Sequence, residues 1–412
     1  MSNVKSSVSL TSGELLTNQY NKSFCIKPFT EISNSATGQR MLCCRSEPVI
    51  GKDEVNSSIT EDFYNHPSMN EIRRKMLAGE EVEECWICSK SENTRGTSHR
   101  TMIMEQFERL VPGLADDIFK NGTIDLKSLD IRFGTKCNLA CVMCGPGSSS
   151  LIAKEEQENN FEVVDLNDFS LDAIKKHSEG IVLFKTTGGE PMLLPAYKKT
   201  LEFFVEKGYA KNIEFTTITN GTIDYSDLMP LMNEFKLFKI SHSIDAADES
   251  YNYVRWPGTI KRLERIHKSI SKNAKQYKNI RLQFGATIHA LNVNQTIKIV
   301  KYLEELGEYD NYSADMVYSP DYMQPGLAPK EVIDELEIEA IKWASNSNNS
   351  HSHKEMLDFI NTLRYNYNTI NSSIEKKQEL LNQLEAKTIF WKQKRKLDVR
   401  DYVPYYKAMQ SK

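Results

Sequence analysis

Residues 129–147 read LDIRFGTKCNLACVMCGPG and place three cysteines directly after a strand-like run. The run LDIRFG (129–134) predicts a buried β-strand, and Cys137, Cys141 and Cys144 follow it with the spacing C-x3-C-x2-C. A tetrahedral structural metal takes four protein ligands, whereas this loop offers three thiols. Iron–sulfur clusters are also held by thiolates, and a cluster iron without a cysteine is free to bind another molecule. The loop therefore predicts either a cluster with an open iron or a zinc site whose fourth ligand lies elsewhere.

The segments downstream of this strand alternate between strand-like and helix-like patterns. Further apolar, β-branched runs are expected to be strands, at 181–187, 213–219, 237–244, 280–288 and 315–319. Between them, PAYKKTLEFFVEKG (195–208) and TIKIVKYLEELG (296–307) have helical periodicity and end at a glycine. Six strands of this kind fall short of the eight in a closed barrel. The sequence thus predicts an α/β fold, a partial (β/α)6 TIM-like barrel that binds ligands at the carboxyl ends of its strands.

Composition restricts the class of protein. The chain has 412 residues, of which 40% are hydrophobic and 26% charged, which suits two or three packed domains. Its net charge of −4 gives no global basic field, so we expect no nucleic-acid partner, although a local basic groove stays open. The polar N-terminus lacks the apolar region of a signal peptide, and no run is long enough to span a membrane. We therefore expect a cytoplasmic protein.

The cysteines divide the chain into parts. All eight lie within the first 144 residues, as ligand clusters in a reducing compartment would. We expect residues 1–21 to be disordered or extended, and 22–125 to form a small, irregular cysteine-rich domain before the barrel. The barrel itself is expected over 126–325, followed by a helical C-terminal extension over 326–412. Within this extension we expect a loop at SNSNNSHSH (345–353), and DVRDYVPYY (398–406) either packs back onto the barrel or forms a partner surface.

The cysteine loop resembles the signature loop of the radical S-adenosylmethionine (SAM) enzymes, which has the same spacing after the first strand. The resemblance implies a [4Fe–4S] cluster on Cys137, Cys141 and Cys144, with SAM bound at the open iron through its amino and carboxylate groups. It also implies an activity. The reduced cluster gives one electron to SAM, which releases methionine and a 5′-deoxyadenosyl radical that abstracts hydrogen from the substrate.

Later strand ends carry further residues of this resemblance. The second strand ends in TTGGEP (186–191), where the family has a GGE motif. Gly188 and Gly189 would let the backbone approach SAM, and Glu190 would accept a hydrogen bond from its ammonium group. The alternative is a Gly-Gly turn at a strand end without a ligand.

The remaining expected SAM contacts follow the third to fifth strands. The family places polar side chains here, often toward the ribose, and the matching residues are Asn220, Ser243 and Asp245. Arg255, in YNYVRWPG (251–258), matches an arginine that faces the SAM carboxylate, and a forked donor suits that group. Met143 stands where the family often has an aromatic residue against the adenine, a contact that a polarizable Met can also make. Thr287 and Asn292 are further candidates near the adenosine, whereas His242 and His289 receive no role.

A second set of thiols lies upstream. Twelve residues separate Cys25 from Gly38 and four separate Gly38 from Cys43, a spacing similar to that of the twitch and SPASM auxiliary-cluster domains. A C-x2-C pair follows, and the resemblance implies a fully cysteine-ligated auxiliary [4Fe–4S] cluster on Cys25, Cys43, Cys85 and Cys88. Cys44 could replace Cys43, and a zinc ribbon would also accept four cysteines.

This set departs from the family in its position, because twitch and SPASM domains usually follow the barrel. Radical SAM proteins with a similar N-terminal order share a Glu after the C-x2-C pair and then S-x-R, here Glu92 and SHR (98–100).

The resemblance leaves the net reaction open. An auxiliary cluster accepts an electron from a substrate radical or anchors the substrate, so we expect oxidation or modification of a peptide or small molecule. A flavodoxin or ferredoxin would be the reductant. The alternatives are modification of a sugar or nucleoside, and a non-catalytic interaction protein that binds zinc or an iron–sulfur cluster.

Overall fold

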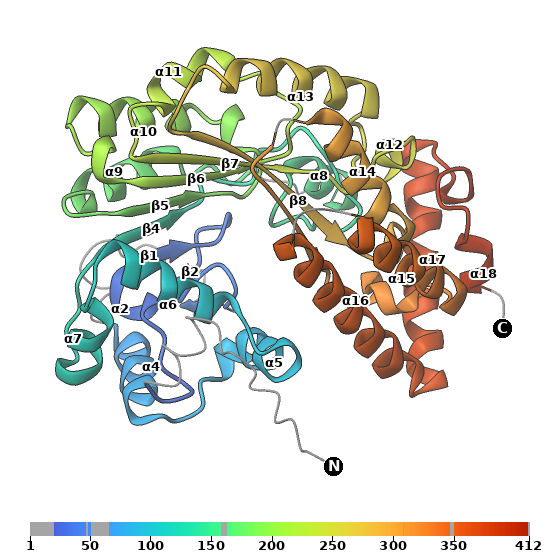
Figure 1. The fold of residues 1–412 in the computed structure, drawn as a ribbon, viewed down its shortest axis with the longest axis horizontal. Helices are drawn as coiled ribbons and strands as arrows, with labels where there is room; N and C mark the ends of the chain where they lie inside the picture. The colour runs from blue at the N-terminus through green and yellow to red at the C-terminus, as the bar shows by residue number, and fades with distance from the viewer. Residues whose placement is uncertain are drawn as a thin grey trace. The chain divides into compact units, whose positions relative to one another are not determined.

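The computed structural model shows an α/β fold with a mostly parallel sheet and many helices (Figure 1). The structure describes residues 20–46, 48–50, 66–157, 163–307, 309–346 and 350–410. Most of the expected disordered N-terminus, 1–19, lies outside these residues. Contacts divide the chain into a first unit, Met1–Arg132 with Asp168–Lys185, and a second unit, Phe133–Asn167 with Thr186–Lys412. The four-part division expected from the sequence stays a prediction.

The sheet of the first unit begins with an antiparallel hairpin. Strand β1 (Glu31–Asn34) pairs with β2 (Arg40–Met41), and Gly38 takes a φ of 88° in the turn between them. Strand β1 also pairs in parallel with β4 (Ser128–Ile131). The strand order of this unit is β3 (Pro48–Ile50), β2, β1, β4, β5 (Leu183–Thr186).

The cysteine-rich region is more helical than expected. Helix α4 (Pro67–Ala78) buries Met69, Ile72 and Met76 at helical spacing, and it ends at Gly79 with a φ of 76°. These signals are readable in the sequence, so the prediction of an irregular region is wrong for this part. Other helices of the unit are α2 (Lys27–Thr30), α5 (Trp86–Arg95), α6 (His99–Leu110) and α7 (Leu114–Asn121).

The second unit holds four parallel strands in the order β6 (Glu214–Thr219), β7 (Leu237–Ser243), β8 (Ile280–Ile288) and β9 (Asn311–Met316). The strands expected at 213–219, 237–244 and 280–288 are confirmed to within a residue. The bounds expected for the last strand, 315–319, are wrong. Residues of β9 alternate between exposed polar and more buried apolar side chains, so the strand has no continuous apolar run to mark it.

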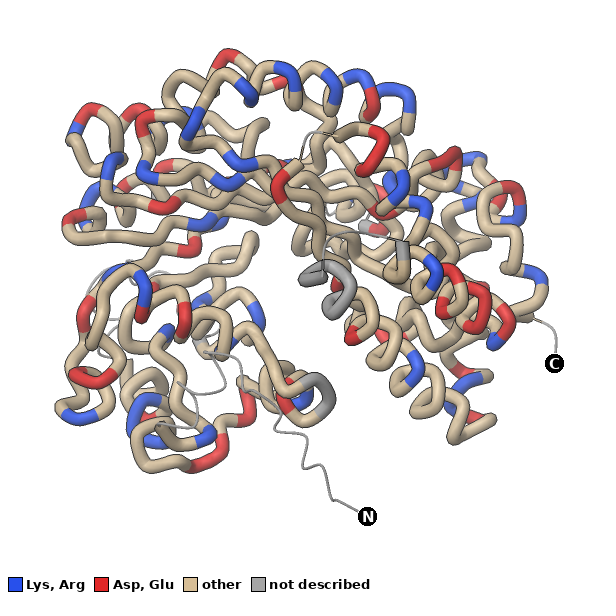
Figure 2. The backbone as a smooth tube through the Cα atoms, viewed as in Figure 1, with Lys and Arg blue, Asp and Glu red and all other residues tan. Residues whose placement is uncertain are grey.

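Helices of the second unit lie along one side of β6, β7 and β8 (Figure 1). They are α10 (Pro195–Glu206), α11 (Met229–Met232), α13 (Ile260–Ala274) and α14 (Thr296–Leu306). Every second residue of β8 is buried, which packs one face of the strand into the core while the other face stays half-buried. The exposed residues of α13 are largely basic, as Figure 2 shows, among them Lys261, Arg262, Arg265, Lys268 and Lys272.

The C-terminal extension is helical, as expected. It contains α15 (Lys330–Asn346), α16 (Ser350–Asn371), α17 (Ile374–Arg395) and α18 (Tyr406–Gln410). The loop expected at 345–353 is mostly helix, and its residues 347–349 lie outside the described ones. Buried side chains of these helices share one core with β8, including Leu363, Leu384 and Trp391. Among the described residues, no helix is long and apolar enough to cross a membrane.

The segment after α17 packs against the strand ends of its unit. The Tyr405 hydroxyl donates a hydrogen bond to the Ala290 carbonyl at 2.9 Å. The same hydroxyl oxygen accepts one from the Val293 amide at 3.1 Å. The Ser250 hydroxyl donates to the Tyr402 carbonyl at 2.7 Å. These contacts confirm that 398–406 packs back onto the barrel strands.

A pair of buried histidines under α13 makes stability sensitive to acid. The ring of His242 stacks on His267 with centroids 4.8 Å apart, and the Tyr225 hydroxyl lies 2.6 Å from His242 Nε2. Burial lowers the pKa of His242 to about 3. Between this pH and about 6.5, the ordinary pKa of histidine, the imidazole is protonated in the unfolded chain but not in the folded one. The stabilisation is present above pH 6.5 and is lost as the pH falls.

We expect this one histidine to lower the free energy of unfolding by about 2 kcal/mol between pH 7 and pH 5. Urea unfolding of wild type and His242→Phe at both pH values measures it, because the variant lacks this proton-linked loss. An equal pH dependence in the two proteins would contradict the assignment.

Candidate functional site

The backbone of the cysteine loop is hydrogen bonded to the end of α12 (Ser250–Val254) and to the residues that follow this helix. The Ala140 amide donates to the Trp256 carbonyl at 2.6 Å, and the Val142 amide donates to the Val254 carbonyl at 2.9 Å. Ala140 and Val142 are both buried. The loop forms neither helix nor strand, so its buried amides donate their hydrogen bonds to carbonyls of another segment of the same unit.

Two serines at the start of α8 (Ser150–Gln157) fix the other end of the loop. The Ser149 hydroxyl donates to the Leu139 carbonyl at 2.6 Å, and Ser150 Oγ accepts from the Cys137 amide at 3.1 Å. Sequence reasoning missed both serines. Their only signal is a run of small polar residues before a helix, which predicts capping rather than a site.

The three thiols of the loop differ in environment. Cys141 is buried, Cys137 is half-buried and Cys144 is exposed. Burial raises the pKa of Cys137 to about 12, whereas a hydrogen bond with Cys144 lowers the pKa of Cys141. The Leu139 amide nitrogen lies 3.5 Å from Cys137 Sγ and donates to it. Thiols that lie this close together and accept backbone hydrogen bonds fit the thiolate ligands of an iron–sulfur cluster.

The described residues contain no group of three or more His, Cys, Asp or Glu side chains that could hold a metal ion. Each cysteine of a cubane cluster binds a different iron, whereas the ligands of a single ion surround one point. The assignment of Cys137, Cys141 and Cys144 as ligands stays a prediction.

The GGE motif lies against the backbone of the cysteine loop. Gly189 has a φ of 57°, and a Cβ placed on it would lie 2.4 Å from the Lys136 carbonyl oxygen. The next amide, of Glu190, donates to that same carbonyl at 2.8 Å. Gly188 also has a positive φ, of 83°. The structure thus shows a close approach of Gly189 to the backbone of the loop, and the expected approach of Gly188 and Gly189 to SAM stays a prediction.

The carboxylate of Glu190 is fully buried at the end of β6. Its Oε1 accepts from the Thr219 hydroxyl at 2.8 Å, and its Oε2 accepts from the Asn220 amide at 2.7 Å. Burial raises the pKa of Glu190, and these hydrogen bonds oppose that rise. The carboxylate therefore joins two strand ends, and its expected contact with the SAM ammonium stays a prediction.

Asn138, directly after the first cysteine of the loop, belongs to a small amide network that sequence reasoning missed. Its Oδ1 accepts from Asn220 Nδ2 at 2.7 Å, and its Nδ2 donates to the Thr222 hydroxyl at 2.9 Å. The Thr222 hydroxyl in turn donates to Asn220 Oδ1 at 2.6 Å. Asn220 is thus oriented by the cysteine loop, and an amide beside a cysteine gives no sequence signal for this.

Arg255 is held by a buried carboxylate. Its Nε donates to Asp245 Oδ2 at 2.6 Å, and Asp245 Oδ1 accepts from the Thr287 amide at 2.8 Å. The side chain of Asn292 bridges the Asp245 and Thr287 carbonyls at 2.8 and 3.0 Å. These contacts place Asp245, Thr287 and Asn292 around Arg255 as its support. Their expected contacts with the ribose and adenosine stay predictions.

Two further expected SAM contacts are half-buried in this unit. Ser243 ends β7, and Met143 packs against the apolar core beside the loop. Neither position excludes the expected role, and neither tests it.

The upstream cysteines lie near one another within the first unit. Burial raises the pKa of Cys25 to about 11, with the nearby Cys88 adding to the rise. Burial also raises the pKa of Cys85, with Cys25 and Cys88 acting in the same direction, and Cys25 acts likewise on Cys43. These mutual effects link Cys25, Cys43, Cys85 and Cys88, the expected auxiliary ligands.

Glu92 and the residues SHR (98–100) form contacts within the first unit. The Arg100 guanidinium and the Ser98 hydroxyl both donate to the Glu92 carboxylate, which joins the end of α5 to the start of α6. Ser98 and the Arg100 backbone also hydrogen bond the Cys88 thiol and oppose the rise of its pKa, which burial causes. Ser98 and Arg100 therefore position Cys88, one of the expected auxiliary ligands.

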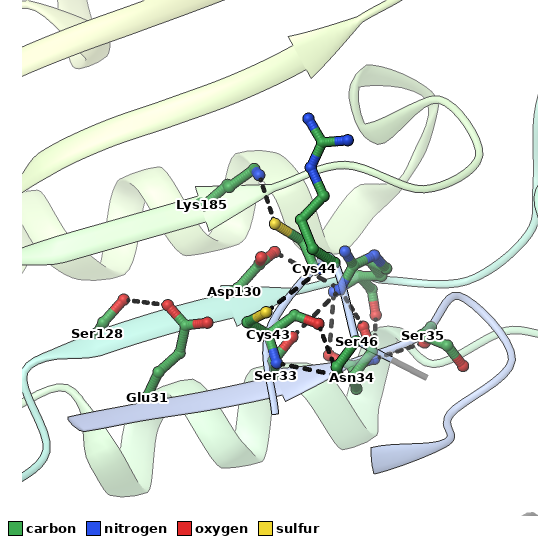
Figure 3. Close-up of polar contacts among 12 residues, drawn as sticks. Glu31, Ser33, Asn34, Ser35, Cys43, Cys44, Ser46, Ser128, Asp130 and Lys185 are labelled. Carbon is green, nitrogen blue, oxygen red and sulfur yellow. Dashed lines mark hydrogen bonds and ion pairs between the residues drawn. The ribbon is translucent and has the colours of Figure 1, made fainter. Parts of the chain in front are cut away.

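Cys44 has a different environment from Cys43. Its Sγ lies 3.2 Å from Lys185 Nζ and 3.6 Å from His99 Nε2, and Figure 3 shows the thiol directed toward the lysine. Burial alone would raise the pKa of Cys44, but Lys185 and His99 lower it well below its ordinary value. Sequence reasoning missed Lys185, although a lysine inside the apolar run IVLFKTT is an available signal.

Buried charges surround this thiol (Figure 3). Lys27 Nζ lies 2.7 Å from Glu31 Oε1, and the Ser128 hydroxyl donates to Glu31 at 2.7 Å. Asp130 is fully buried, and its Oδ1 lies 3.6 Å from Nη1 of Arg132. Strands β1 and β4 thus bury charged side chains beside their apolar residues.

Comparison with known proteins supports part of this description. Residues 131–307, less than half of the chain, match the family model described as the Radical SAM superfamily. The match supports a radical SAM domain, with SAM and an iron–sulfur cluster as its cofactors, and an enzyme whose reaction it leaves open. No protein of curated function matches the chain.

Several solved structures are similar to this chain. The structure of anSMEcpe with bound AdoMet is 21% identical with a TM-score of 0.41, over 53% of this chain and 58% of that one. Streptococcus suis SuiB bound to S-adenosylmethionine is 14% identical with a TM-score of 0.36, over 68% and 60%. TYW1 with a lysine-pyruvate adduct is 15% identical with a TM-score of 0.32, over 59% and 81%. The chain covers less than two thirds of the anSMEcpe and SuiB structures.

The close approach of Gly189 to Lys136 predicts a specific cost of substitution. Gly189→Ala adds a Cβ 2.4 Å from a carbonyl oxygen at a φ of 57°, whereas Gly208→Ala meets nothing within 4 Å at a φ of 70°. We expect Gly208→Ala to cost about 1 kcal/mol of stability through backbone strain alone. Gly189→Ala should cost at least twice that, because the cysteine loop must move. Urea unfolding measures both, and equal losses would contradict the close approach.

Proposed function

We propose that this chain cleaves SAM reductively at a [4Fe–4S] cluster held by Cys137, Cys141 and Cys144. When bound, the cluster supplies the electron that splits SAM into methionine and a 5′-deoxyadenosyl radical for hydrogen abstraction. The observation that carries the proposal is the anchoring of one three-cysteine loop on two sides. The GGE motif lies against Lys136, and the segment before Gly258 pairs with Ala140 and Val142.

Arg255 is our choice for the residue that binds the SAM carboxylate. Its Nε is engaged by Asp245, which fixes the plane of the guanidinium and leaves its forked Nη groups for a second carboxylate. The side chain of Arg255 is 8% exposed, so water competes little for that position. Gly188, Gly189 and Glu190 would lie at the SAM ammonium, and Asn220 and Ser243 at its ribose. Met143 would lie against the adenine.

We further propose an auxiliary [4Fe–4S] cluster on Cys25, Cys43, Cys85 and Cys88. The mutual electrostatic effects among these thiols support it, as do the hydrogen bonds from Ser98 and Arg100 to Cys88. Cys43 is preferred over Cys44 because Lys185 and His99 already occupy the Cys44 thiol. The substrate would be a peptide or small molecule that is oxidised or otherwise modified, with a flavodoxin or ferredoxin as reductant.

Loss of Cys137 should abolish SAM cleavage. We expect anaerobically reconstituted wild type with dithionite and SAM to produce 5′-deoxyadenosine, and Cys137→Ala to produce none above background. Cys85→Ala is the matched control, because it removes a thiol of the upstream set and should keep measurable cleavage. Liquid chromatography of the nucleoside products decides the result. A wild type with its iron restored that makes no 5′-deoxyadenosine would overturn the proposed function.

Iron content distinguishes Cys43 from Cys44. We expect wild type to hold about eight irons per chain and Cys43→Ser about four, because one cluster loses a ligand. Cys44→Ser should keep the wild-type iron content. Iron and sulfide analysis, with the absorbance near roughly 400 nm that iron–sulfur clusters give, measures both. Iron loss in Cys44→Ser alone would exchange the two assignments, and zinc in place of iron would make the upstream site a zinc ribbon.

A further inference from the structure

Arg395, the last residue of α17, is buried although the helix around it is strongly charged. Its side chain is 2% exposed, and that of its carboxylate partner Glu155 is 12% exposed. A buried arginine is costly unless it is paired and hydrogen bonded, so a chain retains one where its contacts are needed. The proposed function does not use this residue.

The first contact of Arg395 reaches the helix that begins at the cysteine loop. Its Nε and Nη2 donate to the two carboxylate oxygens of Glu155 at 3.0 and 2.6 Å, in a forked arrangement. Glu155 lies on α8, and both Ser150, the first residue of this helix, and Ser149, which precedes it, hydrogen bond the backbone of the loop. A movement of Arg395 is therefore transmitted to the loop through one short helix.

The second contact reaches the segment that pairs with the loop. The guanidinium carbon of Arg395 lies 5.2 Å from the ring centroid of Trp256 and 5.3 Å from that of Trp391. A guanidinium over two indole rings gains cation–π energy, which is larger when water is excluded. The carbonyl of Trp256 accepts the hydrogen bond of Ala140, the residue before Cys141. Arg395 thus contacts two of the segments that support the cysteine loop.

A second ion pair between these two helices is far more exposed. Lys387 of α17 pairs with Glu156 of α8 at 2.7 Å, but their side chains are 32% and 28% exposed. Exposed pairs contribute little, because water screens them and both side chains lose freedom. Of the two ion pairs described between α8 and α17, that of Arg395 is therefore the buried one.

We propose that Arg395 is a positioning residue through which the C-terminal extension closes the cysteine loop and tunes the cluster held there. The cluster part of this inference rests on the proposed function, whereas the loop-closing part does not. A fixed cation near a cluster favours its more negative, reduced state and so raises its reduction potential. The contacts place this cation beside the loop, because Arg395 packs on Trp256 and the Trp256 carbonyl accepts from the amide of Ala140, the neighbour of Cys141.

The loop-closing part is tested on apoprotein without any cluster. Cys141 is 6% exposed and Cys144 is exposed, so Cys144 serves as the internal reference for alkylation by iodoacetamide, followed by peptide mass spectrometry. We expect Arg395→Gln to raise the alkylation rate of Cys141 relative to Cys144 by about tenfold, because local opening becomes easier. Arg400→Gln is the matched control, since Arg400 pairs with Asp398 and its side chain is 50% exposed. It should leave the ratio unchanged.

The electrostatic part is tested on reconstituted protein by redox titration followed by electron paramagnetic resonance. We expect Arg395→Gln to lower the midpoint potential of the SAM-binding cluster, which reduces the fraction of reduced cluster severalfold at a fixed potential. Glu155→Gln should open the loop as well but should not lower the potential, because the cation remains. Arg395→Lys should keep most of the potential yet open the loop, since an ammonium cannot form the fork.

The outcomes separate this inference from the proposed function. If wild type cleaves no SAM, the function fails while the alkylation ratios still decide the loop-closing role. If wild type cleaves SAM and Arg395→Gln changes neither the Cys141 alkylation ratio nor the potential, the inference is overturned. It is also overturned if Arg400→Gln has the same effects as Arg395→Gln. Should Arg395→Gln fail to fold by circular dichroism, Glu155→Gln tests loop closure, and Arg395→Lys tests retention of the potential.

Discussion

The second unit depends on satisfying the backbone of a loop that has no secondary structure of its own. A buried amide or carbonyl without a partner costs free energy comparable to a lost hydrogen bond, so a buried loop needs partners from elsewhere. Here the partners come from three places along the chain. Glu190 bonds Lys136, Val254 and Trp256 bond Val142 and Ala140, and Ser149 bonds Leu139. The loop is therefore shaped by three segments at once: the one after β5, the one at the end of α12 and the one before α8.

This constraint explains why some of the site was predictable and some was not. The strands β6, β7 and β8 could be predicted from the sequence because each contains an apolar, β-branched run. The cysteine loop could be predicted because three residues of a scarce type lie close together. The last strand, β9, was placed too late because its exposed face interrupts the apolar run. The helix α4 was readable from Pro67 and Gly79 but was overlooked beside the cysteines. Local patterns thus identify a strand when neither of its faces is exposed, and a helix when a cap is present.

The supporting residues were not predictable for a different reason. Asn138, Ser149 and Glu155 act through partners that lie far along the chain, and none has an unusual neighbourhood in sequence. Asp245 was expected at the ribose, yet its carboxylate binds Arg255 and the Thr287 amide. A single polar residue at a strand end can face a ligand or orient a neighbour, and only the three-dimensional contacts tell which.

Buried charge separates the two thiol environments of the first unit. A thiol beside a cation favours its thiolate form, and a thiol among other thiols resists ionisation until a metal supplies the opposing charge. Cys44 belongs to the first kind, because Lys185 lies 3.2 Å from its sulfur, and Cys43 belongs to the second. Adjacent cysteines on one turn can therefore serve different purposes, since the backbone directs their side chains to different neighbours. The consecutive pair Cys43 and Cys44 is better understood as one candidate ligand and one charge-paired thiol than as two interchangeable ligands.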